Sequence, residues 1–271
     1  MNRAIFAVAA LAAGALLAMT GLAAPRGDAP VVSSLAPLME KELHWGMTHV
    51  EVVDAYNHPT GLFDREYAPR LAKLQPGVDM DELQAERDNR KSNFAHAYSE
   101  FLDTPTGYDL TPLKSEYSYN NGEALQKLYK DGKTRFFFYI KDRLWKIYDE
   151  VPLGSDGALG GSFQAALTRI AGVLGAPGRV RPGGTQGLEQ TTADWQDSAT
   201  HLRVVDRSSD HLVGLVLEDK RTVANLPSLR TAKAQDPFAL DPSIAAITRG
   251  GVTDPNAARQ QDVDAGARKR K

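Results

Sequence analysis

The sequence contains no cysteine, and this absence removes several kinds of chemistry. No disulfide, thiolate nucleophile, cysteine metal site or lipid-modified cysteine at a processed N-terminus can form. A strong charge of either sign is also missing, because 32 basic and 34 acidic residues give a formal net charge of −2. A dedicated nucleic-acid-binding protein should be strongly basic. We therefore expect no nucleic acid among the partners.

Motifs of the common enzyme classes are missing as well. The nearest candidate for a nucleophile elbow, Gly160-Gly161-Ser162-Phe163, lacks the following glycine, so we interpret Ser162 as a helix cap. The glycines of 172–187 match neither the phosphate-loop spacing nor the dinucleotide fingerprint. We expect no cofactor.

Histidines are few, and their spacing does not favour a metal site. His44, His49 and His58 lie five and nine residues apart, which one helical face does not bring together. We expect no metal-binding and no catalytic residues, and predict a protein that is not an enzyme. An enzyme with a dispersed active site stays an alternative.

Only the N-terminus holds a long apolar run. Residues 1–3 supply one fixed cation, and 4–19 follow without a charged side chain. This run is shorter than the roughly 20 residues of a spanning helix, and small residues at Gly21 and Ala23 suit a signal-peptidase cut. We predict a signal peptide cleaved after about Ala23, a periplasmic or secreted protein, and no transmembrane anchor after cleavage. Export without cysteine is typical of a bacterial envelope protein.

Hydrophobic periodicity after the signal predicts an α+β fold. We expect two helix-plus-antiparallel-meander units in tandem, the first with a helical insertion. The order of elements, rather than sequence identity, suggests a weak internal repeat. The predicted segments are a signal peptide (1–23), a flexible leader (24–34), a helix-plus-meander domain (35–151) with the helical insertion (62–102), a linker (152–161), a second helix-plus-meander domain (162–230) and a disordered tail (231–271).

The first unit should begin with helices. A short helix is predicted at 34–42, and Thr48 and Glu51 form a capping box for a helix at 49–57. Two charged helical stretches follow at 62–74 and 79–102, the second with Asp79 as its N-cap. The second stretch is polar on every side in its middle, so we expect it to project or to cover the sheet at one end only.

An antiparallel meander should follow. Alternating patterns predict strands at 114–119, 125–129, 135–140 and 144–151. The hairpin turns are expected at Asn121-Gly122, Asp131-Gly132 and Lys141-Asp142. Aromatic residues point to both faces of 136–140, so either a helix covers the second face or that face is a binding surface. The helical insertion favours the first interpretation.

The second unit repeats this order. Ser162 should cap a helix that ends at 175–178, and a glycine-rich loop should continue to Gly187. Strands are predicted at 191–196, 201–206 and 212–218, with further helix at 220–230. In the tail, Arg268, Lys269, Arg270 and Lys271 form a basic cluster, which is a possible surface-binding segment for anionic lipid or polysaccharide.

One stretch carries a resemblance to known proteins. The string Trp45-Gly46-Met47-Thr48-His49-Val50-Glu51-Val52 leads towards a meander that ends in Leu144-Trp145-Lys146-Ile147. It resembles uncharacterised exported proteins of Gram-negative bacteria. More distantly, it is similar to the helix-plus-meander domain of the small outer-membrane assembly lipoprotein family and of the tandem-domain β-lactamase inhibitor proteins. The chain departs from the lipoprotein family because it lacks the lipidated cysteine.

The resemblance implies binding to other proteins rather than catalysis, and it carries over no functional residue. We therefore expect an exported, non-enzymatic protein-binding or envelope-associated module whose partner is another envelope or secreted protein. An enzyme with a dispersed site, or a protein that binds anionic surfaces through its basic tail, are the alternatives.

Overall fold

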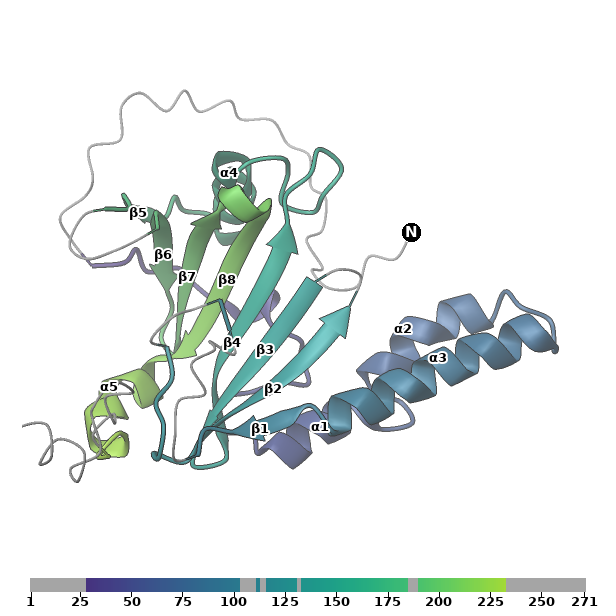
Figure 1. The fold of residues 1–271 in the computed structure, drawn as a ribbon. Helices are drawn as coiled ribbons and strands as arrows, with labels where there is room; N and C mark the ends of the chain where they lie inside the picture. The colour runs from purple at the N-terminus through teal and green to yellow at the C-terminus, as the bar shows by residue number, and fades with distance from the viewer. Residues whose placement is uncertain (1–27, 103–110, 113–115, 131–132, 185–189, 233–271) are drawn as a thin grey trace, which may run out of the picture.

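The computed structural model describes residues 28–102, 111–112, 116–130, 133–184 and 190–232. Within them, helices and strands alternate in blocks, which confirms the α+β class (Figure 1). The helices are α1 (His49–Asn57), α2 (Leu62–Leu71), α3 (Val78–Ala95), α4 (Phe163–Leu174) and α5 (Lys220–Leu229). The strands are β1 (Tyr98–Glu100), β2 (Glu123–Lys130), β3 (Lys133–Ile140), β4 (Arg143–Pro152), β5 (Arg179–Arg181), β6 (Thr192–Gln196), β7 (Thr200–Arg207) and β8 (Leu212–Asp219).

The described strands pair antiparallel in a single sheet with the order β1-β2-β3-β4-β8-β7-β6-β5. Helix α1 comes before β1 to β4 along the chain, and α4 comes before β5 to β8. The last strands of the two series, β4 and β8, lie side by side from Lys146 opposite Glu218 to Pro152 opposite Leu212. The two series therefore share one sheet, while their division into two related domains stays a hypothesis.

Two local sequence features, a capping box and a hairpin turn, fix the start of α1. In the expected capping box, the Glu51 backbone N–H donates to Thr48 Oγ1 at 3.2 Å, and the Thr48 N–H donates to Glu51 Oε2 at 2.7 Å. The Lys141-Asp142 turn is confirmed, with φ of 51° and 54°, as a tight hairpin turn requires. Its Asp142 carboxylate also accepts from the His49 N–H at 3.1 Å. The β3–β4 turn thus holds α1 against the sheet.

The predicted strand at 114–119 is wrong in its described part, because residues 116–119 form no strand. The rings of Tyr117 and Tyr119 instead pack against Phe101, with centroid distances of 4.2 and 5.9 Å. Their aromatic area therefore covers the sheet rather than extending it. Asn121 and Gly122 consequently join no pair of described strands.

Strand β1 occupies the edge of the sheet where the strand predicted at 114–119 was expected. The helix predicted at 79–102 begins at Val78, with Gly77 rather than Asp79 as its N-cap, and ends at Ala95. The chain then pairs with β2, so that Tyr98 lies opposite Gln126. This pairing satisfies backbone N–H and C=O groups at the edge of β2. These groups would have lacked partners if the helix had continued to residue 102.

Three smaller expectations also need comment. The helix predicted at 34–42 is reduced to a 3-10 turn at Ala36–Leu38. The loop expected through Gly187 contains β5, which pairs with β6. The Asp131-Gly132 turn lies outside the described residues.

Both faces of the sheet are covered. On the first face, which carries Phe137 and Tyr139, a core forms with α1 to α4 and the segment 32–47. On the second face, which carries Phe136 and Phe138, a smaller core includes Phe101 and has the partly buried Tyr117, Tyr119, Leu226 and Leu229 packed against it. Helix α5 therefore covers part of the second face, and the aromatic residues of β3 are buried on both sides.

The second half of the expected leader is held against β6. The Gln196 N–H donates to Pro30 O at 2.9 Å, and the Val32 N–H donates to Gln196 O at 2.8 Å. Ala29 and Val32 are buried. The segment then crosses the first face towards α1, and the Leu35 N–H donates to Asp197 Oδ2 at 2.7 Å. This crossing ties the β6 edge to the helices at the other end of the sheet.

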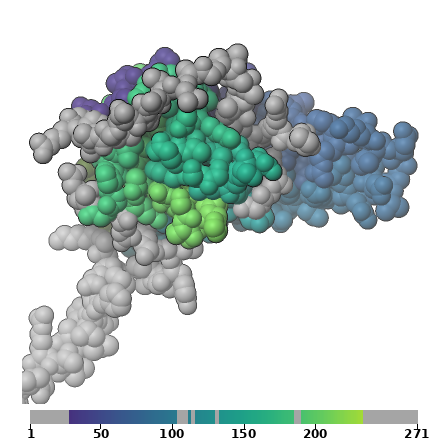
Figure 2. All heavy atoms as spheres, turned by 90° about the horizontal axis from the view of Figure 1, so that it is seen from above, coloured from purple at the N-terminus to yellow at the C-terminus, as the bar shows by residue number. Residues whose placement is uncertain are grey.

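Helices α2 and α3 form an arm that projects beyond the sheet (Figures 1 and 2). Its inner end is fixed by Gln126 on β2, whose Nε2 donates to Phe94 O at 3.0 Å and whose Oε1 accepts from the Tyr139 hydroxyl at 2.9 Å. Along the arm, charged pairs join the two helices, including Lys91 with Asp64 at 2.7 Å. The arm is therefore anchored at its base and polar beyond it.

We predict that Gly178→Ala destabilises the fold, because a Cβ at this position would lie 2.4 Å from the buried ring of Trp195. Overpacking of this kind costs about 1–3 kcal/mol. The matched variant Gly172→Ala meets no atom within 4 Å and lies inside α4, so it should stabilise by up to about 1 kcal/mol. Urea unfolding measures both free energies. Equal stability of the two variants would contradict the close packing at Trp195.

Candidate functional site

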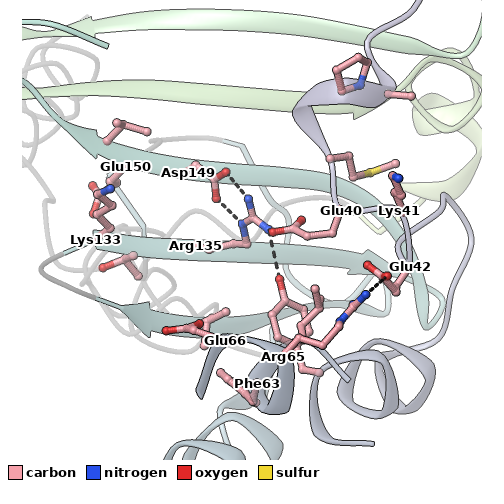
Figure 3. Close-up of a pocket in the computed structure, with 18 of the residues that line it drawn as sticks. Glu40, Lys41, Glu42, Phe63, Arg65, Glu66, Lys133, Arg135, Asp149 and Glu150 are labelled. Atoms are coloured by element: carbon pink, nitrogen blue, oxygen red, sulfur yellow. Dashed lines mark hydrogen bonds and ion pairs between the residues drawn. The ribbon is translucent and has the colours of Figure 1, made fainter. Parts of the chain in front are cut away.

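A cleft of about 810 Å³ opens on the first face, between the base of the arm and the N-terminal segment (Figure 3). Its floor comes from the ends of β2, β3 and β4 at the β2–β3 hairpin. One wall is built by α2 and α3, and the other by residues 34–42. Three parts of the chain that are distant in sequence thus enclose it.

The surface of the cleft combines apolar walls with charged groups. The apolar lining consists of Ala36, Pro37, Met39, Leu62, Phe63, Leu128 and Val151. The basic lining residues are Lys41, Arg65, Arg90, Lys133 and Arg135, and the acidic ones are Glu40, Glu42, Glu66, Asp149 and Glu150. The two signs are balanced, so the cleft suits an apolar group flanked by polar ones rather than a strongly charged ligand.

The buried guanidinium of Arg135 forms the centre of the floor. Arg135 lies opposite Asp149 in the β3–β4 ladder and donates to both carboxylate oxygens, from Nε at 2.5 Å and from Nη2 at 2.6 Å. Its Nη1 donates to Glu40 and, at 3.1 Å, to the hydroxyl of Tyr56 (Figure 3). We call these four residues the Arg135 cluster. The two parallel bonds to Asp149 fix the orientation of its carboxylate.

Burial and neighbouring charges fix the protonation state of the Arg135 cluster. Burial opposes the charge on Arg135, but Asp149 and Glu40 outweigh it and hold its pKa well above the ordinary value. Burial, together with the charge of Glu40, raises the pKa of Tyr56. Near neutral pH the guanidinium therefore stays charged and the phenol stays neutral.

Two of the lining residues keep a buried polar atom without a partner among the described residues. These atoms are Oε2 of Glu40 and Nη2 of Arg90, one an acceptor and the other a donor. A buried polar group without a hydrogen bond costs about 1–3 kcal/mol.

Ion pairs also connect the walls of the cleft. Arg65 on α2 reaches Glu42 on the N-terminal segment at 2.7 Å, and this contact lowers the pKa of Glu42. On the arm, Arg90 pairs with Glu66 at 3.0 Å and lies 4.9 Å above the ring of Phe63. The Arg65 side chain is half exposed, so the Arg65–Glu42 pair is weak and can open.

A second charged cluster lies on the second face, across β4, β8, β7 and β6. Lys146 lies near Glu218 (3.4 Å), and His201 lies between Glu218 (Nδ1 to Oε2, 3.2 Å) and Asp194 (Nε2 to Oδ2, 3.6 Å). Arg179 on β5 closes the row with a bond to Asp194 at 2.6 Å. We call this set the His201 row. It neutralises polar side chains that share a sheet face with an apolar core.

The sequence alone suggests few candidate site residues. The basic residues Arg268, Lys269, Arg270 and Lys271 lie outside the described residues, as does the segment predicted to be a signal peptide. Ser162 is confirmed as a helix cap, because its Oγ accepts from the Ala165 N–H at 3.1 Å. His201 is partly buried between two carboxylates.

The other histidines do not assemble a site. His49 stacks on Tyr98 at 4.2 Å and contacts Asp142 at 2.7 Å, whereas His58 contacts its neighbour Thr60. Within the part of the chain that the structure describes, no three metal-ligating side chains gather. None of the helices described there is long and apolar enough to span a membrane.

The Arg135 cluster was not predicted from the sequence. A signal for it does exist, because Arg135 is a single cation at the start of the run Phe136-Phe137-Phe138-Tyr139-Ile140, and Asp149 lies on the next predicted strand. Opposite charges on neighbouring strands indicate a cross-strand pair once the register is known. Glu40 and Tyr56, however, reach the pair only through the tertiary fold.

Comparison with known protein families, curated proteins and solved structures found no significant match. The resemblance carried by 45–52 and 144–147 therefore stays a prediction.

We predict that Arg135→Met strongly destabilises the protein, because it leaves the carboxylates of Asp149 and Glu40 without their cation. Removing one partner of a buried ion pair costs about 3–5 kcal/mol. Lys133→Met is the matched control, since Lys133 also lines the cleft but has no ion pair among the described residues. It should change the unfolding free energy by less than about 0.5 kcal/mol. Similar losses in the two variants, measured by urea unfolding, would argue against a buried Arg135 cluster.

We further predict that the His201 row makes stability depend on pH. Burial lowers the pKa of His201, but bonds to Asp194 and Glu218 outweigh it and raise the pKa. A histidine whose pKa is raised in the folded state stabilises the fold fully below the pKa of about 6.5 that it has in the unfolded chain. This contribution to stability is lost as the pH rises through the pKa of the folded state.

The carboxylates behave in the opposite way. Burial opposes ionisation of Glu218, yet His201 and Lys146 lower its pKa to about 2, so its contribution is lost as pH falls. The advantage of the wild type over His201→Gln should therefore be largest between about pH 4.3 and 6.5, the ordinary pKa values of Glu and His. Thermal unfolding across pH 4 to 9 measures it. An advantage that grows above pH 7 would contradict the assignment.

Proposed function

We propose that this chain is an exported, non-enzymatic module that binds another envelope or secreted protein through the cleft. The observation that supports the proposal is the form of the cleft, with apolar walls around a fixed and internally neutralised floor. Its volume of about 810 Å³ lies in the range of roughly 300–1,000 Å³ found for pockets that enclose a small molecule, so it has room for a side chain of a partner. The export step rests on the N-terminal sequence.

The pairing of the charges favours binding over chemistry. Each acidic lining residue has an arginine partner. Glu40 and Asp149 contact Arg135, while Glu42, Glu66 and Glu150 contact Arg65, Arg90 and Arg207. General acid–base catalysis needs a group whose pKa lies near the working pH. The raised pKa values of Arg135 and Tyr56 move these groups away from it.

The second hypothesis, an enzyme, would be supported by a cleft lined by both histidine and carboxylates. The described lining holds five carboxylates and no histidine, while His201 belongs to the other face of the sheet. The apolar part of this lining would accept an apolar side chain of a protein partner. Polar residues next to this side chain would contact the charged residues that line the cleft.

We predict that Ala36→Trp weakens partner binding, because this exposed residue lines the cleft and an indole there would occupy part of it. Linear peptides selected from a displayed random library against the immobilised full chain are the probes, and calorimetry measures their Kd. The loss should be roughly ten-fold or more, which is about 1.4 kcal/mol.

Ala85→Trp is the matched control, since Ala85 is exposed on α3 and does not line the cleft. It should leave the Kd unchanged. Peptides whose affinity is insensitive to Ala36→Trp, or equally sensitive to Ala85→Trp, would place binding elsewhere and contradict the proposal.

A further inference from the structure

The outer edge of β2 is paired along only part of its length. Strand β1 covers Ala124, Leu125 and Gln126, and beyond them no described strand pairs with 127–130 on this side. On the other side, β3 pairs with β2 up to Lys130 opposite Lys133. Beyond the Lys127 N–H, which donates to Ala97 O, the end of β2 near the hairpin is therefore a free edge, which is a template for another strand.

The hydrogen-bond pattern shows which backbone groups are free. The Phe101 N–H donates to Glu123 O at 2.9 Å, and the Lys127 N–H donates to Ala97 O at 3.4 Å, so the odd-numbered residues of β2 point outward. Tyr129 continues this series. Its side chain is 69% exposed, and its N–H and C=O have no partner among the described residues.

The free edge adjoins the cleft. Leu128, between Lys127 and Tyr129, packs in the core of the first face and lines the cleft. The arm diverges from β2 beyond its base (Figure 1), and its α2 and α3 form the neighbouring wall of the cleft. A strand added beside 127–129 would alternate its side chains, so that the one next to Leu128 would point towards the cleft.

Charge indicates the chemistry of such a strand. Lys127 is exposed at the edge with its Nζ 5.8 Å from the ring centroid of Phe136, and Lys133 lines the cleft across the hairpin. Lysines on an edge strand oppose pairing with a second copy of the same edge, because like charges would face each other. The same lysines attract a segment that carries carboxylates.

We propose that the partner contributes an extended, acidic segment that pairs with 127–129 of β2 as an added strand and inserts an apolar side chain beside Leu128 into the cleft. This inference rests on the proposed function and names its mode of recognition. Main-chain hydrogen bonds to Tyr129 supply affinity, whereas the cleft and Lys127 select the sequence.

The test compares variants of the free edge in the full chain, with the synthetic form of the selected library peptide as the probe. Tyr129→Pro removes the outward N–H and is tolerated on an edge strand, so the β2–β3 ladder should persist. Tyr129→Ala removes the ring but keeps the N–H, and it serves as the control. We expect Tyr129→Pro to raise the Kd roughly ten-fold and Tyr129→Ala to raise it far less.

Two further readouts do not depend on how well Tyr129→Pro folds. In the wild type, the bound peptide should slow hydrogen exchange of the Tyr129 amide. Lys127→Glu should weaken an acidic peptide and strengthen its lysine-substituted counterpart. Both results support the added strand.

Other outcomes separate this inference from the proposed function. If Ala36→Trp weakens binding but Tyr129→Pro and the amide exchange show no effect, the cleft binds and the added strand is wrong. If neither Ala36→Trp nor Tyr129→Pro changes the Kd of the peptide, both proposals fail. A dimer of the free protein that Tyr129→Pro dissociates would show that a second copy occupies the edge, and this would overturn the partner segment.

Discussion

The guanidinium of Arg135 joins β3 to three other parts of the chain, because Asp149 lies on β4, Glu40 on the N-terminal segment and Tyr56 on α1. A buried charge without partners is far more costly than one that is fully paired. Each of these segments must therefore keep its place for the charge to remain tolerable. The position of the cleft floor relative to its walls follows from this constraint.

Two further connections extend the constraint across the molecule. The β4–β8 ladder merges two series of strands into one sheet, and the N-terminal segment bonds to Gln196 before it crosses the first face to supply Glu40. At the opposite wall, Gln126 holds the end of α3 through Phe94 O. The sheet, the N-terminal segment and the arm thus meet around the cleft, and a hydrogen bond or an ion pair fixes the position of each.

Local patterns explain why much of the fold was predictable. The capping box at Thr48, the cap at Ser162 and the Lys141-Asp142 turn are short-range signals, and the structure confirms each of them. Strand β1 and the bends at 116–119 were not predictable, because tertiary packing of Tyr117 on Phe101 outweighed an alternating pattern. Local periodicity does not show which of two segments will pair with a sheet edge.

The candidate site was less predictable than the fold. Its charged floor depends on residues 40, 56, 135 and 149, whose proximity is a product of topology rather than of spacing. The free edge of β2 likewise depends on β1 beginning only at Tyr98, opposite Gln126. A short edge strand of this kind has no sequence signature beyond a few alternating residues.

The most direct measurement of the central claim is a titration of the nitrogen-15-labelled full chain with the selected peptide, followed by amide chemical shifts. The account predicts that the largest changes fall together on 36–42, on 127–129 and on 133–135, which surround the cleft and the free edge. Changes concentrated on the outer arm at 71–82, or around the His201 row, with the cleft unperturbed, would contradict it.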